Sequence, residues 1–547
     1  MTCHVVSARY QSTPEELIDL NSKLSRLREG KPLRVVDLFS GCGGMSLGLH
    51  RAGYSLLGGV EINPKAIHTH ASNFFNQLGE ESFELHSTPR DIRTFTPDLF
   101  MREILHKEHS NNLVDLIVGG PPCQAFARVG RAKLRHVRQD PEAYLKDERA
   151  SLYLQYLAYV EYFRPLAVIM ENVPDIMNYG GRNVAEEIAC TLDELGYRCH
   201  YTILNTANYG VPQMRQRFYL IALLDALNIN PDPYFPEPTH FIEVSPCYEH
   251  ARSTALSMIP RIEVRQKKLF DNPATHYIAP PSVSKHLPPA ITTQEALSDL
   301  PPIFYHLELQ TGRGRVRNFD TMVRYSGENE PSAYALDMRT WPNFQSRGGI
   351  WDHVIRLLPR DYPIFARMEQ GAEYPRAYKF AEQIFHEKLS EQEAATGRVI
   401  AKDSAEYQAL WKATVPPYDP NKFPNKWWKL IPDQPSRTLT AHMGKDTYSH
   451  IHYSDDQARV ISVREAARLQ SFPDGFQFTG PMNAAYTQIG NAVSPLQAYR
   501  FGIHMQAILK KAADQRYEIN EAYLHTSAPL EENMNGTRQQ EEVVGSA

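Results

Sequence analysis

Short apolar runs alternate with longer amphipathic stretches in the first half of the chain. Runs of this kind are typical of buried β-strands, and they occupy residues 33–39, 56–60, 113–118, 167–170 and 218–223. Between the third and fourth runs, apolar side chains recur at helical spacing, at Leu152, Tyr156, Tyr159 and Phe163. Strands and helices in alternation are typical of a parallel sheet. The pattern therefore predicts an α/β domain with a doubly wound, mostly parallel sheet.

The whole chain can be divided into segments by composition and by the pattern of apolar residues. Residues 1–31 are polar and are interpreted as an N-terminal leader, whereas the alternating pattern occupies residues 32–240. Residues 241–430 are rich in proline and aromatic residues and show no strand–helix rhythm, which predicts a smaller, irregular second domain. Regular structure returns over residues 431–515, and this segment is expected to rejoin the first domain. The tail, residues 516–547, is polar and acidic, a composition typical of disorder.

Two helices are predicted in the C-terminal segment. Ser462 and Glu465 have the spacing of a capping box, and Pro473 limits the helix that follows. Ser494 and Pro495 suit the N-cap and first position of a longer helix. Its apolar stripe is predicted to consist of Leu496, Tyr499, Ile503 and Ala507.

Composition narrows the class of protein without indicating a partner. The 547 residues include 58 Lys and Arg against 63 Asp and Glu, and 42% of the chain is hydrophobic. These values are ordinary for a globular protein and exclude collagen, a coiled coil or disorder throughout. The net charge of −5 argues weakly against a nucleic-acid partner. Because no apolar run approaches the ~20 residues of a spanning helix, no membrane partner is expected.

The cysteines and histidines indicate neither a disulfide scaffold nor a metal site. The six cysteines form no CxxC pair and have no regular spacing. This usage is typical of a reducing compartment, so a cytoplasmic location is predicted. No zinc-ligand spacing is present either, and no metal is expected.

A glycine-rich segment, residues 37–44, directly follows the first predicted strand. Glycines there let the backbone turn sharply and approach a ligand closely. Glu61 ends the second predicted strand, where an acid can bind ribose hydroxyls. A dinucleotide, S-adenosylmethionine and an ordinary strand-to-helix turn are all compatible with this pattern. The glycine spacing, which is not GxGxxG, favours S-adenosylmethionine slightly.

Reactive side chains lie at or beside the ends of three other predicted strands. Cys123 comes after two prolines that stiffen the loop behind the third predicted strand, and Glu171 lies at the end of the fourth. A carboxylate at that position is costly to bury without a partner. Arg215 and Arg217 precede the next predicted strand. Because ligands of open α/β sheets bind at the carboxyl edge, we expect the thiol, the acid and both arginines around one pocket.

Taken together, these segments resemble the DNA cytosine-5 methyltransferases. The matching motifs, in the family's usual order, are residues 39–44, 121–124, 171–173, 213–217, 464–473 and 490–493. The resemblance covers about 33–240 and 431–510, and such enzymes carry their target recognition domain in the stretch between, here 241–430. Ala127 departs from the family, which usually has serine there. The departure leaves the nucleophile untouched and puts a loop contact in doubt.

The resemblance implies covalent catalysis on a base flipped out of duplex DNA. Cys123 would add to carbon 6 of cytosine, and Glu171 would hold or protonate ring N3. Arg215, and after it Arg217, would bind the base's O2 or position the loop. A base or water, which the sequence does not identify, would remove the proton at carbon 5.

Two basic runs are candidates for DNA contact. Residues 128–138 carry five Lys or Arg and no acid. Directly after the nucleophile, this run is expected to form a mobile lid over DNA rather than a solvated helix. A second run, residues 313–317, is interpreted either as a phosphate contact or as an exposed loop.

For S-adenosylmethionine, the resemblance implies a binding site assembled from several motifs. The methionine part would contact the glycine loop, and the ribose would bind to Glu61. The adenine would contact the loop after the next strand. The remaining members would line and close the pocket. The implied residues are Phe39, Gly41, Gly43, Glu61, Asp91, Ile92, Pro121, Asn491 and Val493.

The implied function is transfer of a methyl group from S-adenosylmethionine to carbon 5 of cytosine in a specific duplex DNA sequence. A monomer of the bacterial cytosol or nucleoid is expected. Without chromatin-type modules, the chain is most like a restriction-modification methyltransferase, which implies a cognate endonuclease for the same site. An RNA-methylating member of the family and a catalytically silent DNA-binding regulator are the alternatives. A nicotinamide oxidoreductase ranks third, because the cysteine loop has no role there.

Overall fold

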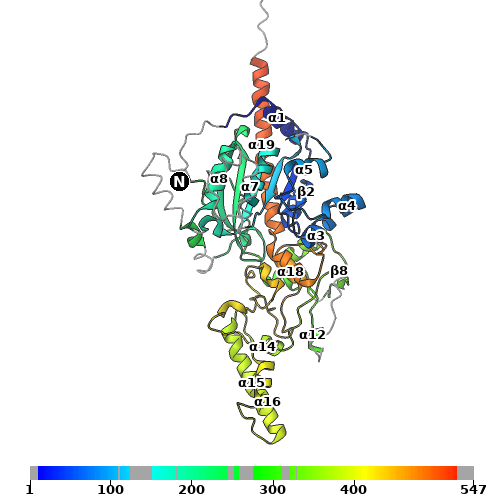
Figure 1. The fold of residues 1–547 in the computed structure, drawn as a ribbon, viewed down its shortest axis with the longest axis vertical. Helices are drawn as coiled ribbons and strands as arrows, with labels where there is room; N and C mark the ends of the chain where they lie inside the picture. The colour runs from blue at the N-terminus through cyan, green and yellow to red at the C-terminus, as the bar shows by residue number, and fades with distance from the viewer. Residues whose placement is uncertain are drawn as a thin grey trace, which may run out of the picture.

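The structure, a computed structural model, describes residues 10–108, 111–122, 151–179, 181–243, 252–257, 275–308, 321–327 and 329–526. Its upper part is an α/β domain, and its lower part narrows to a helical arm (Figure 1). In the described part of the chain, no helix is long and apolar enough to cross a membrane.

One six-stranded sheet forms the centre of the α/β domain. Its strands are β1 (Arg34–Leu38), β2 (Ser55–Val60), β3 (Leu116–Gly119), β4 (Ala167–Asn172), β5 (Tyr197–Asn205) and β6 (Gln216–Leu224). Their order across the sheet is β2-β1-β3-β4-β6-β5. The pairs among β2, β1, β3 and β4 are parallel, whereas β6 runs antiparallel to both β4 and β5. The predicted fold class, an α/β fold with a mostly parallel sheet, is confirmed.

The strand predictions need two corrections. The run at 218–223 is β6, which is antiparallel rather than another strand of a βαβ series. Strand β5 was not predicted at all. Polar side chains such as Arg198, His200 and Thr202 interrupt its sequence, so it contains no continuous apolar run.

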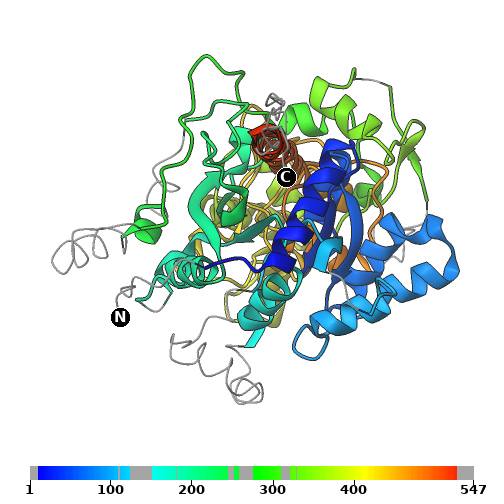
Figure 2. The same ribbon diagram turned by 90° about the horizontal axis from the view of Figure 1, so that it is seen from above.

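Helices cover both faces of the sheet. Those of the α/β domain are α1 (Pro14–Arg28), α2 (Gly44–Arg51), α3 (Pro64–Phe74), α4 (Glu80–Ser87), α5 (Pro97–Glu103), α7 (Ser151–Phe163), α8 (Val184–Glu194) and α19 (Pro495–Thr526). Figure 2 shows α19 and α7 on opposite sides of the strands. Helix α19 approaches α2 closely because Gly48 has no side chain. A Cβ at Gly48 would lie 2.3 Å from the oxygen of Pro495.

The leader and the tail are more structured than the sequence suggests. Helix α1 begins with a capping box, and its Leu20 and Leu24 are buried in the core of the α/β domain. Helix α19 continues to Thr526, so residues 516–526 are helical rather than disordered. Residues 527–547 lie outside the described part of the chain.

The buried face of α19 differs from the predicted stripe. Ile503 is 45% exposed, whereas Ala498, Phe501 and Met505 are buried. Leu496, the first member of the predicted stripe, is buried as expected. The close contact with α2 sets the rotation of α19 about its axis, and that contact is not visible in the spacing of apolar residues alone.

The second domain has several helices, which long stretches without regular structure separate. It contains α11 (Thr293–Leu297), α12 (Tyr305–Glu308), α13 (Ala333–Thr340), α14 (Tyr362–Arg367), α15 (Tyr374–Thr396) and α16 (Ala405–Thr414), with the short strands β7 (Val323–Arg324) and β8 (Gly349–Ile350). Helices α15 and α16 form the lower arm in Figure 1. Its core crosses the predicted boundary at residue 430, because Trp427 stacks on Tyr448 with ring centroids 4.7 Å apart.

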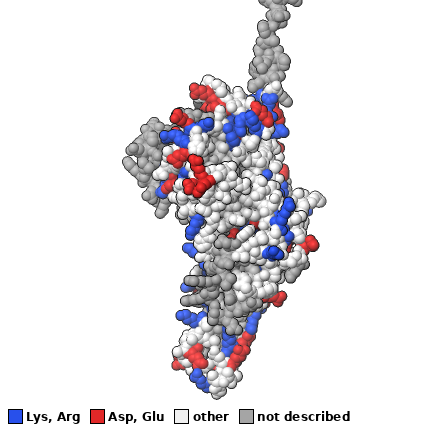
Figure 3. Space-filling model, turned by 90° about the vertical axis from the view of Figure 1, so that its right-hand side faces the viewer, with Lys and Arg blue, Asp and Glu red and all other residues white. Residues whose placement is uncertain are grey.

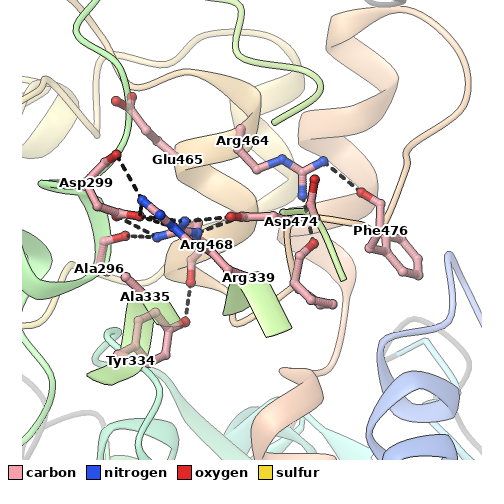
Figure 4. A network of polar contacts seen from close by, with 12 residues as sticks. Ala296, Asp299, Tyr334, Ala335, Arg339, Arg464, Glu465, Arg468, Asp474 and Phe476 are labelled. Carbon is pink, nitrogen blue, oxygen red and sulfur yellow. Dashed lines mark hydrogen bonds and ion pairs between the residues drawn. The ribbon is translucent and has the colours of Figure 1, made fainter. Parts of the chain in front are cut away.

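The C-terminal segment adds α17 (Val463–Leu469) and α18 (Met482–Asn491), and the capping box of Ser462 and Glu465 is present. Figure 4 shows how α17 is anchored. The fully buried Arg468 forms ion pairs with Asp299 and Asp474, at 2.9 and 2.6 Å. Arg464 donates to the carbonyls of Pro473 and Phe476. These arginines therefore join the second domain to the C-terminal segment and do not belong to the edge of the sheet.

Candidate active site

Four chain segments meet at one edge of the sheet because of strand direction. The parallel strands β1, β3 and β4 end there, with Leu38 opposite Gly119 and Gly119 opposite Met170. Strand β6 begins at the same edge, since Phe218 pairs with Asn172. A parallel strand would begin at the opposite edge. The antiparallel direction of β6 is thus the reason that residues just before it reach the site.

Glu171 and Arg217 form an ion pair at this edge. Arg217 Nε lies 3.0 Å from Glu171 Oε1, and the two side chains are only 14% and 12% exposed. Burial raises the pKa of Glu171, while the positive charges of Arg217 and Arg215 oppose that rise. Because its proton is held more tightly than that of an ordinary glutamate, Glu171 is suited to donate a proton or a hydrogen bond to a bound base.

The loop after β3 packs directly against this pair. A Cβ at Gly120 would lie 3.2 Å from Glu171 Oε2, so the glycine allows the close approach. Asn172 Nδ2 donates to the carbonyl of Pro121 at 2.7 Å. Pro121 is buried and Pro122 is exposed. The next residue, Cys123, lies outside the described residues, as do Ala127 and the basic runs.

Arg215 has different surroundings from Arg217. Its guanidinium is buried and donates to the backbone carbonyls of Leu439, Gly490 and Ala492, at 2.6, 3.1 and 3.3 Å. Burial, and next the charge of Arg217, lower the pKa of Arg215 to about 9. Two of the three carbonyls lie at the C-terminal end of α18, where a cation is favoured. Arg215 therefore ties the start of β6 to the C-terminal segment.

The glycine loop is compact because two of its glycines have neighbours that leave no space for a side chain. Gly43 caps α2 with a φ of 98°, and a Cβ there would lie 2.6 Å from the ring of Phe74. A Cβ at Gly44 would lie 2.2 Å from the oxygen of Val493. Among the described residues, none has an atom within 4 Å of the position that a Cβ at Gly41 would take. The loop is thus packed on one side and open on the other.

Glu61 is fixed beside the open side of this loop. The amide of Gly41 donates to its Oε2 at 3.0 Å, and the amide of Asn63 donates to its Oε1 at 2.8 Å. Burial raises the pKa of Glu61, and these backbone hydrogen bonds oppose the rise. Each carboxylate oxygen keeps a second lone pair that can accept a hydrogen bond from a ligand hydroxyl.

An exposed apolar side chain next to Glu61 was not predicted. Ile62 is 58% exposed although it follows a buried strand. The available signal was an apolar residue directly after the carboxylate at a strand end.

Asp91 lies nearby, because the amide of Arg90 donates to the carbonyl of Glu61. Asp91 pairs with Arg93 at 2.6 Å, and the side chain of Ile92 is buried in the core.

A buried polar network supports the loop from beneath, and sequence reasoning missed it as well. The hydroxyl of Ser46 donates to Asp37 Oδ2 at 2.6 Å and lies 3.0 Å from His70 Nε2. Burial raises the pKa of Asp37 to about 7 and lowers that of His70 to about 3. His70 is therefore neutral and donates through Nε2 to Ser46. Its ring also lies under Gly43, 2.8 Å from where a Cβ would be.

The C-terminal segment reaches the loop at Val493, whose carbonyl faces Gly44. The thiol of Cys42 also lies 3.8 Å from the carbonyl of Gln488 in α18. Asn491, at the end of the same helix, is exposed. Phe39 has a φ of 58°, which turns the chain from β1 into the loop. The predicted donor-site residues of the loop, of β2 and of residues 490–493 thus lie around one edge.

Comparisons with known proteins agree with this geometry. The family model described as C-5 cytosine-specific DNA methylase matches residues 33–506. A protein of Oceanobacillus iheyensis named as type II methyltransferase M.OihORF3336P is 34% identical over 464 residues, which are 85% of this chain and 93% of that protein. Type II methyltransferase M1.HphI of Haemophilus parahaemolyticus is 33% identical over 478 residues, 87% of each chain.

Among solved structures, a prophage-encoded DNA modification methyltransferase from E. coli matches with a TM-score of 0.52 and 21% identity. The match covers 87% of this chain and 99% of that one. At this identity the likeness concerns the fold, which agrees with the six-stranded sheet described above.

Proposed function

This chain belongs to the family of C-5 cytosine-specific DNA methylases, and we propose that it methylates cytosine within a specific duplex DNA sequence through a covalent adduct of Cys123. Membership of the family implies DNA as the substrate and S-adenosylmethionine as the methyl donor. The observation that carries the mechanism is the buried pair of Glu171 and Arg217. It lies against the loop that leads into Cys123.

The residues at the glycine loop fit the methyl donor. Glu61 presents a carboxylate whose remaining lone pairs suit the two ribose hydroxyls. Ile62 offers an exposed apolar side chain to the adenine ring. Gly41 leaves the loop open at the position where the backbone would contact the methionine part. When bound, S-adenosylmethionine supplies an electrophilic methyl group on a sulfonium.

The protein's own side chains would perform the chemistry on the base. The Cys123 thiolate forms a bond to carbon 6, and the displaced electrons make carbon 5 nucleophilic. Glu171 donates a proton or hydrogen bond to N3, and Arg217 stabilises the negative charge that develops on O2. After carbon 5 is methylated, loss of its proton to a base or water expels the thiolate. The guanidinium of Arg215 donates to three backbone carbonyls and would position the start of the strand that carries Arg217.

The second domain, with its helical arm, is proposed to recognise the target sequence. Carbon 6 cannot be reached within a duplex, so the base must be flipped out at a cost of a few kcal/mol. On the face in Figure 3, side chains of both signs gather at the two ends, while most of the described residues between the ends are uncharged. A net charge of −5 therefore says little about DNA binding, which depends on where cations face phosphates.

The bacterial relatives named as type II methyltransferases support a role in protecting DNA from a cognate restriction endonuclease. We propose that the enzyme acts as a monomer in the bacterial cytosol or nucleoid.

The decisive experiment compares the wild type, Cys123→Ala and the matched control Cys199→Ser, which replaces a buried cysteine of β5. Labelled methyl transfer is measured into duplex DNA and into tRNA, and covalent trapping is measured on 5-fluorocytosine DNA. We expect Cys123→Ala to lose transfer and trapping while it keeps donor binding, and Cys199→Ser to keep all three. Turnover by Cys123→Ala would overturn the mechanism. Transfer into tRNA alone would identify an RNA enzyme, and DNA binding without transfer by the wild type would identify a silent regulator.

A further inference from the structure

Helix α8 and the segment that begins at residue 275 bring three metal-binding side chains together, outside the proposed active site. Donor atoms of Glu186, Cys190 and His276 all lie within 4.8 Å of one another. Glu186 and Cys190 are one helical turn apart and share a face of α8. His276 is 90 residues beyond Glu186 in the chain. It reaches α8 because its carbonyl accepts from the amide of Tyr201, in the edge strand β5.

The two ring nitrogens of His276 have different partners. Nδ1 faces Glu186 Oε1 at 2.9 Å, and Nε2 lies 2.6 Å from Asp193 Oδ2. A histidine that binds a metal usually donates its other ring N–H to a carboxylate, which fixes the ring and raises its basicity. Asp193 occupies that second position, one further turn along α8 from Cys190.

Glu186 is held in the same manner. The hydroxyl of Tyr201 donates to Glu186 Oε2 at 2.8 Å, and Asn183 Nδ2 donates to that hydroxyl at 2.9 Å. Glu186 Oε1 is thereby directed toward His276. The donors and the groups that orient them are both present, as they are in evolved metal sites.

We propose that Glu186, Cys190 and His276 Nδ1 bind a zinc ion. A thiolate, an imidazole and a carboxylate form a donor set that zinc accepts in tetrahedral geometry, with water as the fourth ligand. Magnesium and calcium prefer oxygen donors only. Binding releases the proton of the Cys190 thiol and any proton held on Nδ1. The ion would fasten the segment after residue 275 to α8 and so brace the edge of the sheet.

The competing interpretation is a clamp without a metal, in which hydrogen bonds and charges alone hold the segment after residue 275 against α8. Burial lowers the pKa of His276, but hydrogen bonds to Asp193 and Glu186 outweigh it and raise the pKa to about 10. A protonated His276 between two carboxylates would also hold the segment in place. The two interpretations differ in metal content, and a direct measurement distinguishes them.

The test uses the untagged full-length protein, purified without chelators. Elemental analysis should give about one zinc per chain, or one after dialysis against zinc and removal of the excess. Cobalt exchanged for zinc should show a thiolate-to-cobalt charge-transfer band. Cys190→Ser should lose this band, whereas Cys199→Ser should keep it. Asp193→Asn, which keeps all three ligands, should weaken zinc binding about 10–100-fold.

Circular dichroism of each variant without metal shows whether it folds, and Asp193→Asn tests the site even if Cys190→Ser does not. Failure of the wild type to hold stoichiometric zinc would overturn the proposal in favour of the clamp. Zinc binding that is unchanged in both Cys190→Ser and His276→Gln would show adventitious surface binding and would overturn it too. Methyl transfer is not the readout, so either result leaves the proposed function untouched.

Discussion

Arg215 and Arg217 stand two residues apart in one motif, yet their contacts predict opposite consequences for the same substitution. Methionine matches the length of arginine without its charge, so Arg215→Met and Arg217→Met form a matched pair. We expect Arg217→Met to lose catalysis while it remains folded, and Arg215→Met to lose stability. The reason is that Arg217 pairs with Glu171, whereas Arg215 bonds backbone carbonyls.

The effect of Arg217→Met follows from the 3.0 Å ion pair. An arginine this close lowers the pKa of a carboxyl group by about 1–3 units, so its removal should raise the already elevated pKa of Glu171 by about that amount. If Glu171 acts in its protonated form, activity is lost as pH rises through this pKa. The alkaline limb of the rate profile should therefore move to higher pH. Loss of a preorganised donor at the developing charge should also lower kcat by about 10²–10³-fold.

The effect of Arg215→Met follows from its three hydrogen bonds. Bonds to charged groups contribute about 1.5–3 kcal/mol each, and the apolar contacts of methionine offset part of that loss. We therefore expect the free energy of unfolding to fall by about 3–5 kcal/mol. Where the protein remains folded, the alkaline limb of the rate profile should move less than in Arg217→Met, because Arg217 still pairs with Glu171 and only the smaller effect of the Arg215 charge is lost.

Urea denaturation and methyl-transfer rates across pH measure both effects in the same preparations. The reasoning is refuted if Arg217→Met leaves the alkaline limb in place, because the ion pair would then not control Glu171. It is refuted equally if Arg215→Met remains as stable as the wild type and loses only turnover. That result would place Arg215 at the base, as the order of roles implied by the sequence resemblance suggests.

Two further predictions concern the glycine loop and the buried ion pairs of Arg468. Gly43→Ala should weaken S-adenosylmethionine binding by at least about tenfold, because a Cβ at φ 98° would lie 2.6 Å from the ring of Phe74; calorimetry measures this, and an unchanged affinity would show that the loop tolerates a shift. Arg468→Met should lower the free energy of unfolding by about 3–5 kcal/mol, because it leaves Asp474 buried without its ion-pair partner, whereas Asp299 keeps its ion pair with Arg339. Without this cation the pKa of the buried Asp474 carboxyl should rise, so the loss should shrink as pH falls and protonates it. A loss in urea denaturation that does not depend on pH would contradict this explanation.

Much of the α/β domain was predictable because its strands are buried on both faces. Such strands need continuous apolar runs, which are visible in the sequence at β1, β3, β4 and β6. The outermost strand β2 is only partly buried but has an apolar run as well. Strand β5 is the outermost strand on one side of the sheet and carries polar residues, so the search for apolar runs does not find it. The second domain was read as irregular because its helices are short or separated by proline-rich loops, and its core includes residues from beyond position 430.

The sequence by itself determined which chemical groups the protein has and the order in which the strands present them. Glu171 lies near the end of the buried strand β4 and Glu61 directly follows β2, and both positions follow from local sequence. Only the tertiary structure decided that β6 runs antiparallel, and that direction brings Arg217 rather than Arg215 to Glu171. It also decided that His276 meets α8 across 90 residues. The physical reason is that apolar periodicity encodes burial, a local property, whereas strand direction and side-chain partners depend on contacts between distant segments.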